Sequence, residues 1–286
     1  MIKLDTEIKS QFIIDSTRVI PSLEGRINGT FLTNKKIMFS IYSALLVISE
    51  FVTVLEPIYG LLLHSLTLVI LCFHAPLIRR LSPKSSKLAI CLIPIPLIRI
   101  VSITSPLIEF TLLEWFLVIS MILFSSIIAS MVFLGDDLES YGFVLPQRRH
   151  FWLELGVVFL GLIFGYMEYQ ILKPNNMVND LTVPGLAAPL VALYFGTGLL
   201  EELLFRGIIQ KHAIDAFNKW YGVLFTTLIF MIMHTGWESF LDVIFVGAVG
   251  FFFSLVVLKT GSLIGVSFSH AITNLSLFVL TPSLFS

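Results

Sequence analysis

Charged side chains are scarce in this sequence. They occupy 13% of the 286 positions, whereas 56% of the residues are hydrophobic and the mean hydropathy is +0.93. About a quarter of the residues in a soluble domain are charged, so the composition excludes an ordinary soluble protein. The net charge is only −1, which leaves no basic field to attract nucleic acid. A nucleic-acid partner is therefore not expected.

Cysteine is equally rare. Cys72 and Cys91 both fall in apolar runs without metal-ligand spacing, so they are interpreted as small core residues. The motif HExxH is absent, which excludes the usual zinc-peptidase arrangement. A cleavable signal peptide is not expected either, because residues 1–36 carry many charges and no sustained apolar stretch.

Long apolar runs, by contrast, are abundant, and the charges crowd between them. This arrangement is typical of membrane-spanning helices, which need about 20 apolar residues each. The runs predict an all-α, polytopic bundle of eight or nine transmembrane helices. Two runs, 88–104 and 221–236, are short for a full crossing, so both counts stay open. The predicted spans are 37–58, 60–78, 88–104, 107–134, 151–171, 185–209, 221–236, 239–258 and 262–280.

The positions of lysine and arginine predict the orientation. These residues cluster after the second, fourth, sixth and eighth runs and are nearly missing from the other connections. Because they favour cytoplasmic loops, the N-terminus is expected in the cytoplasm, and the membrane in a prokaryote would be the plasma membrane. Three parts are predicted: a cytoplasmic segment (1–36), accessory helices (37–134) and a bundle at 151–280 that carries the chemistry, with its motifs in 185–280.

Ionisable side chains inside the later runs indicate function, because charge is costly in hydrocarbon. Glu201 and Glu202 are adjacent, and Arg206 follows Glu202 by four residues. A spacing of four places an acid and a base on one helix face. Glu202 is therefore expected to pair with Arg206. Glu201, about 100° further round the helix, is left free to act.

Two histidines follow on later helices. His234 ends an otherwise apolar run, and His270 precedes Asn274 by four residues, which places both on one helix face. Measured from the lysines at the cytoplasmic helix ends, Glu201 lies about 15 Å deep, His234 about 22 Å and His270 about 16 Å, at about 1.5 Å per residue. The three groups are therefore expected to meet in one cavity.

Such a set of residues is suited to hydrolysis. A carboxylate beside a histidine can activate water, and a histidine with an asparagine can stabilise an oxyanion. Glutamate with two histidines is also a zinc-type ligand set with an open position, so Zn stays open as a cofactor. Two other classes of protein use similar residues: a non-catalytic immunity or assembly factor, and a proton-coupled transporter.

Other ionisable residues are predicted to be structural. Glu50 and Arg99 lie near span ends or can extend towards the interface, so neither is assigned a role. His64 and His74 are interpreted as helix–helix contacts.

Three motifs in chain order resemble those of the CPBP family, which comprises CAAX proteases and bacteriocin-processing enzymes. They are Glu201-Glu202-xxx-Arg206, Phe230-xxx-His234 and His270-xxx-Asn274. The resemblance implies an α-helical intramembrane endopeptidase that cleaves a membrane-associated peptide or protein, such as a prenylated CAAX-like protein or a leader peptide. It also implies that Glu201 and His234 activate water, that Glu202 and Arg206 brace the site, and that His270 and Asn274 stabilise the oxyanion.

Overall fold

The computed structural model describes residues 34–104, 110–178 and 182–285, and these residues form helices without any strand. Most of the predicted cytoplasmic segment, residues 1–33, lies outside the described part. Within the described part, eight helices are long and apolar enough to cross a membrane. The prediction of an all-α polytopic bundle is therefore confirmed.

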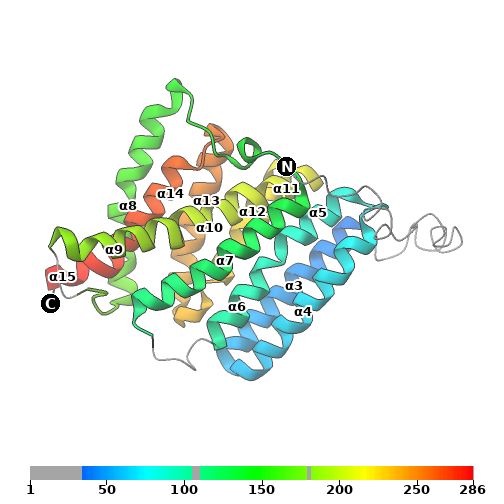
Figure 1. The fold of residues 1–286 in the computed structure, drawn as a ribbon, viewed down its shortest axis with the longest axis horizontal. Coiled ribbons are helices and arrows are strands. Elements are labelled where there is room, and N and C mark those ends of the chain that lie inside the picture. Colours follow the sequence, from blue (N-terminus) through cyan, green and yellow to red (C-terminus); the bar gives the residue numbers. More distant parts are fainter. Residues whose placement is uncertain (1–33, 105–109, 179–181, 286) are drawn as a thin grey trace, which may run out of the picture.

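The first group of helices contains α3 to α7 (Figure 1). Helix α3 begins after Asn34, whose side chain accepts from two backbone N–H groups of the first turn, and α3 packs along α4. The weakest predicted span, 88–104, is part of a crossing from Pro83 to Thr104 in which Pro94 begins the second helix. The bounds are α3 (Lys35–Leu55), α4 (Pro57–Ile78), α5 (Pro83–Leu92), α6 (Pro94–Thr104) and α7 (Leu112–Leu134).

A polar junction ties the end of this group to the later helices. Asp136, just beyond α7, accepts hydrogen bonds from Lys87 at 2.5 Å and from Lys211 at 2.7 Å, and His212 Nε2 lies 3.1 Å away. Burial alone would raise the pKa of the Asp136 carboxyl, but the hydrogen bonds from Lys211 and Lys87 outweigh burial and lower it. The junction therefore holds an ionised carboxylate.

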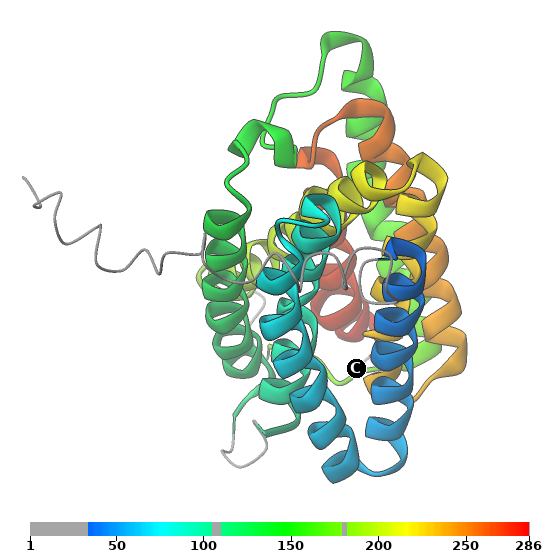
Figure 2. The same cartoon turned by 90° about the vertical axis from the view of Figure 1, so that its right-hand side faces the viewer.

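The second group begins with α8 and ends with α15. The last membrane-length helical segment is the most buried, with 67% of its window inside the protein, and it lies near the centre of the outline in Figure 2 (red). The bounds are α8 (Phe151–Leu172), α9 (Val183–Leu193), α10 (Leu200–Glu202), α11 (Gln210–Ala216), α12 (Lys219–Ile232), α13 (Phe240–Thr260), α14 (Ile264–Leu275) and α15 (Thr281–Phe285).

Close packing of α8 against α14 fixes the helix that carries His270. Gly161 and Gly165 lie four residues apart on α8, and a Cβ at either would collide with a backbone carbonyl of α14, at Ser269 or Thr273. Small residues at this spacing let membrane helices approach closely. The two glycines therefore set the depth and the rotation of α14 against α8.

Helices α9, α10 and α11 form one continuous helical path that crosses the bundle (Figure 1). Two π-helical segments interrupt it, η4 (Tyr194–Leu199) and η5 (Leu203–Ile209), and they enclose Glu201 and Glu202. Wider turns of this kind occur often at functional sites. Helix α12 has 14 residues, a length of about 21 Å, which is short for a crossing by itself.

Candidate functional site

The adjacent carboxylates of Glu201 and Glu202 lie in different environments. Glu202 is fully buried, whereas 26% of the Glu201 side chain is exposed. The cause is the turn of the helix, which separates neighbouring side chains by about 100°. Glu202 thus faces the protein interior, and Glu201 faces a cavity.

Glu202 is held by a cation on its own helix, as the spacing predicts. Arg206 Nη1 donates to Glu202 Oε1 at 2.9 Å, and both side chains are fully buried. Arg206 also donates from Nη2 to the Gly250 carbonyl on α13 at 3.0 Å, and its guanidinium carbon lies 4.1 Å from the centre of the Phe230 ring. A buried ion pair needs such additional partners to offset the loss of hydration.

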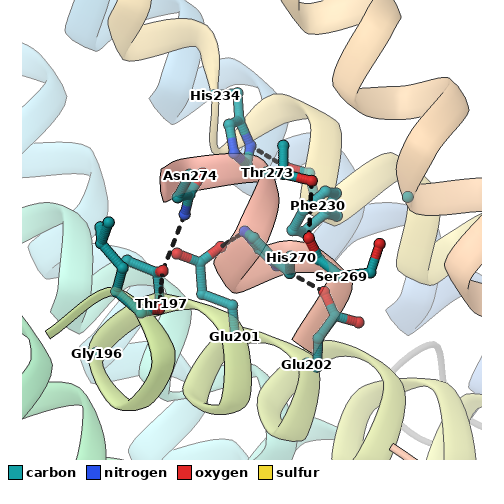
Figure 3. A network of polar contacts seen from close by, with 12 residues as sticks. Gly196, Thr197, Glu201, Glu202, Phe230, His234, Ser269, His270, Thr273 and Asn274 are labelled. Carbon is teal, nitrogen blue, oxygen red and sulfur yellow. Dashed lines mark hydrogen bonds and ion pairs between the residues drawn. The ribbon is translucent and has the colours of Figure 1, made fainter. Parts of the chain in front are cut away.

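His270 connects the two glutamates (Figure 3). Its Nδ1 lies 2.8 Å from Glu202 Oε1, and its Nε2 lies 3.9 Å from Glu201 Oε2. Because a carboxylate only accepts hydrogen bonds, Nδ1 must donate to Glu202. That bond fixes the ring plane and directs Nε2 towards Glu201.

Asn274, one turn beyond His270, is oriented by a residue that the sequence interpretation missed. Asn274 Nδ2 donates to Thr197 Oγ1 at 2.9 Å, and the Thr197 hydroxyl donates to the Leu193 carbonyl at 2.6 Å. A hydroxyl that donates once can still accept, so Thr197 holds one amide hydrogen of Asn274. Thr197 precedes Glu201 by four residues, and this spacing is the signal in the sequence that it shares a face with Glu201.

His234 lies just beyond the end of α12. Its Nδ1 is 2.9 Å from the Phe230 carbonyl, and since a carbonyl only accepts, Nδ1 carries a proton and donates. In the neutral ring, Nε2 is then the acceptor. A short turn, η6 (Thr235–Trp237), follows and reverses the chain towards α13.

A single cavity of about 380 Å³ brings four of the six predicted site residues together. Glu201, His234, His270 and Asn274 line it, while Glu202 and Arg206 lie behind its wall. The remaining wall is mainly apolar and aromatic, with Ile98, Leu112, Trp115, Phe116, Ile119 and Leu123 among its residues.

A third carboxylate, Glu168, also lines the cavity. It comes from the last part of α8 and is 7% exposed. The sequence interpretation did not single it out, although an acidic residue inside an apolar run was the signal used for Glu201.

The expectation that Glu50 and Arg99 extend towards the membrane interface is wrong. Glu50 is 1% exposed and Arg99 8%, so neither side chain extends to the interface. Arg99 Nε lies 3.0 Å from Glu50 Oε1 and Arg99 Nη2 lies 2.7 Å from Glu50 Oε2. His64 is also fully buried, with Nε2 3.5 Å from Glu50. Arg99 additionally lines the cavity that contains His234.

Glu201, His234 and His270 are the side chains that a zinc ion at this site would need as ligands. Among the described residues, no three or more His, Cys, Asp or Glu side chains are grouped so that they would hold a metal ion. The zinc triad considered for Glu201, His234 and His270 is therefore not assembled in this geometry, since His270 directs Nδ1 to Glu202 and Nε2 lies 3.9 Å from Glu201.

One comparison with known proteins found a match. A family model described as type II CAAX prenyl endopeptidase, Rce1-like, matches residues 183–276, about a third of the chain. The matched segment contains all six predicted site residues and Thr197, but neither Glu168 nor the Glu50–Arg99 pair. Comparisons with curated proteins and with solved structures gave no match.

Proposed function

We propose that this integral membrane protein hydrolyses a peptide bond of a membrane-associated substrate of the prenylated CAAX type, because residues 183–276 match the family model of type II CAAX prenyl endopeptidases. The observation that supports this best is the shared cavity of Glu201, His234, His270 and Asn274. Its apolar wall suits a substrate that is itself held at a membrane.

Glu201 is the proposed general base. Its carboxylate opens onto the cavity and is not bound by Arg206, so it is available to a water molecule. His234 offers Nε2 to the same water, because Nδ1 donates to the Phe230 carbonyl. Glu201 takes the proton as the water oxygen adds to the carbonyl carbon of the scissile bond.

Collapse of the tetrahedral intermediate completes the reaction. Asn274 uses one amide hydrogen to bind Thr197, and the other is free to donate to the oxyanion together with Nε2–H of a protonated His270. When the C–N bond breaks, Glu201 returns its proton to the leaving amine. The products are a carboxylic acid, which keeps the OH of the water, and an amine, which receives the other hydrogen through Glu201, so the atoms of one water molecule are accounted for.

The other parts of the protein are proposed to support this site. Glu202 and Arg206 brace His270, residues 151–280 form the catalytic bundle, and residues 37–134 form the accessory helices. We propose an N-terminus in the cytoplasm, on the basis of the lysine and arginine pattern, and the plasma membrane as the location in a prokaryote.

The test is Glu201→Gln, which keeps the shape of the side chain and removes the base. Purified protein in liposomes would receive a quenched fluorogenic farnesylated peptide that ends in a CAAX sequence, and mass spectrometry would locate the cut. Loss of a general base lowers kcat by about 100- to 10,000-fold. Glu238→Gln is the control, because Glu238 is an exposed glutamate on the turn after His234, and wild-type activity is expected for it.

Three outcomes would contradict the proposal. Full cleavage by Glu201→Gln would remove the base from the mechanism. Substrate-driven proton flux into the same liposomes without cleavage would instead favour a transporter, and biological activity that survives loss of both Glu201 and His234 would favour an immunity or assembly factor.

A further inference from the structure

We propose that the buried Glu50–Arg99 pair of the accessory helices is a clamp that positions His234. This inference rests on the proposed function, because the residue that the clamp positions, His234, belongs to the proposed catalytic site. The clamp itself lies in helices outside residues 183–276, which match the family model. Glu50 lies on α3 and Arg99 on α6, so the clamp joins two accessory helices to the turn that carries His234.

The clamp holds His234 through the residues on both sides of it. Arg99 Nη2 donates to the Met233 carbonyl at 2.7 Å. The single hydroxyl hydrogen of Thr235 is shared between the Ile232 carbonyl, 2.9 Å from Oγ1, and Glu50 Oε2, 3.2 Å from it. The His234 ring is tied separately, to the Phe230 carbonyl. Three anchors therefore hold the Met233 carbonyl before the histidine, the Thr235 side chain after it and the ring itself.

The end of α12 explains why a cation is needed here. The last carbonyls of a helix have no partner within the helix, and the negative end of the helix dipole attracts a positive charge. Arg99 satisfies the Met233 carbonyl while Glu50 neutralises the guanidinium. Gly236 leaves space for this approach, because an added Cβ there would lie 3.0 Å from Arg99 Nη1.

Stability alone does not account for the pair. The free energy lost when two charges leave water is about as large as the attraction gained between them in the protein interior. Replacing a buried ion pair by apolar residues therefore often leaves the stability of a protein unchanged. The pair nevertheless sits in apolar helices, beside the cavity, with its hydrogen bonds directed at the neighbours of His234. Positioning of His234 explains the presence of this buried pair, whereas a contribution to stability does not.

The test compares four variants with wild type in the liposome assay with the farnesylated peptide. Arg99→Met removes the clamp but leaves Glu50 charged and without its cation. The double variant Glu50→Gln/Arg99→Met removes both charges and so avoids this unpaired charge. Arg99→Lys keeps a positive N–H donor for the Met233 carbonyl but lacks the planar guanidinium that binds Glu50 and this carbonyl together. Lys87→Met is the control, since it removes another ion pair, with Asp136, from the same span. Unfolding temperature is measured for every variant.

The expected result is a fall in kcat of about 10- to 100-fold for Arg99→Met and for the double variant, because a displacement of about 1 Å costs on that order. KM changes less than about twofold, because Arg99, although it lines the cavity, is proposed to act on His234 through the Met233 carbonyl and Glu50 and not on the substrate. Arg99→Lys recovers part of kcat, the double variant unfolds at a higher temperature than Arg99→Met, and Lys87→Met retains wild-type kcat.

Three results would overturn the clamp. The double variant could keep wild-type kcat, the effect could fall on KM alone and so place Arg99 against the substrate, or Lys87→Met could lower kcat equally. Failure of the proposed function looks different, because wild type would then not cleave the peptide. If wild type cleaves and Glu201→Gln does not while Arg99→Met matches wild type, only the clamp is refuted.

Discussion

Replacement of Arg206 by Met would test how the site tolerates a charge without its partner. The variant loses the 2.9 Å bond to Glu202, the 3.0 Å bond to the Gly250 carbonyl and the 4.1 Å contact with the Phe230 ring. Glu202, which is fully buried, then keeps His270 as its remaining hydrogen-bond partner among the described residues. Removing one member of a buried pair costs about 3–5 kcal/mol. We expect a loss of that size in the free energy of unfolding.

The double variant Glu202→Gln/Arg206→Met separates charge from packing. It removes both charges, and the Gln carbonyl can still accept from His270 Nδ1. About half or more of the lost stability should return, because no buried charge is left alone. Unfolding in detergent, followed by tryptophan fluorescence, measures all three proteins. A single variant within about 1 kcal/mol of wild type, or a double variant as unstable as the single one, would refute the reasoning.

Two further substitutions test packing and pH dependence. Gly250→Ala should lower the free energy of unfolding by about 1–3 kcal/mol, because the new Cβ would lie 2.6 Å from the Phe230 ring and 2.8 Å from Arg206 Nη2. Gly156→Ala is the control in the same unfolding assay. Because Gly156 has open space around it, this change should be neutral or slightly stabilising. The Asp136 carboxylate contributes stability above its unfolded pKa of about 3.9, and this contribution is lost as the pH falls through its lowered folded pKa. The difference in stability between wild type and Asp136→Asn should therefore vanish at low pH. A difference that is constant with pH would contradict this.

The architecture could be predicted because a bilayer restricts the choices. Spanning segments must satisfy their own backbone groups, so apolar runs become helices, and eight such helices are present in the described residues. The Glu202–Arg206 contact could be predicted for a similar reason, because it depends on spacing within one helix. The ambiguous run at 221–236 is α12, whose helix ends at Ile232, so a turn and not a longer helix carries His234.

Contacts between distant segments could not be predicted in this way. Glu50 and Arg99 are 49 residues apart, and Thr197 and Asn274 are 77 apart. The periodicity of one helix shows which of its residues share a face, but not which residues of another helix that face will contact. Snorkelling was assumed for Arg99 because a long side chain can reach the interface, but a carboxylate at the same depth offered a nearer partner.

The two adjacent glutamates show how one short motif can supply opposite environments. Glu202 accepts from Arg206 and His270 at a single oxygen, Oε1, within a wall that excludes solvent. Glu201 shares His270 through the other ring nitrogen, at 3.9 Å, and stays partly exposed to the cavity. A carboxylate bound by an arginine is a weak base because the cation stabilises its charged form. The arginine at position 206, four residues after Glu202 and five after Glu201, therefore decides which glutamate braces the site and which is left to accept a proton.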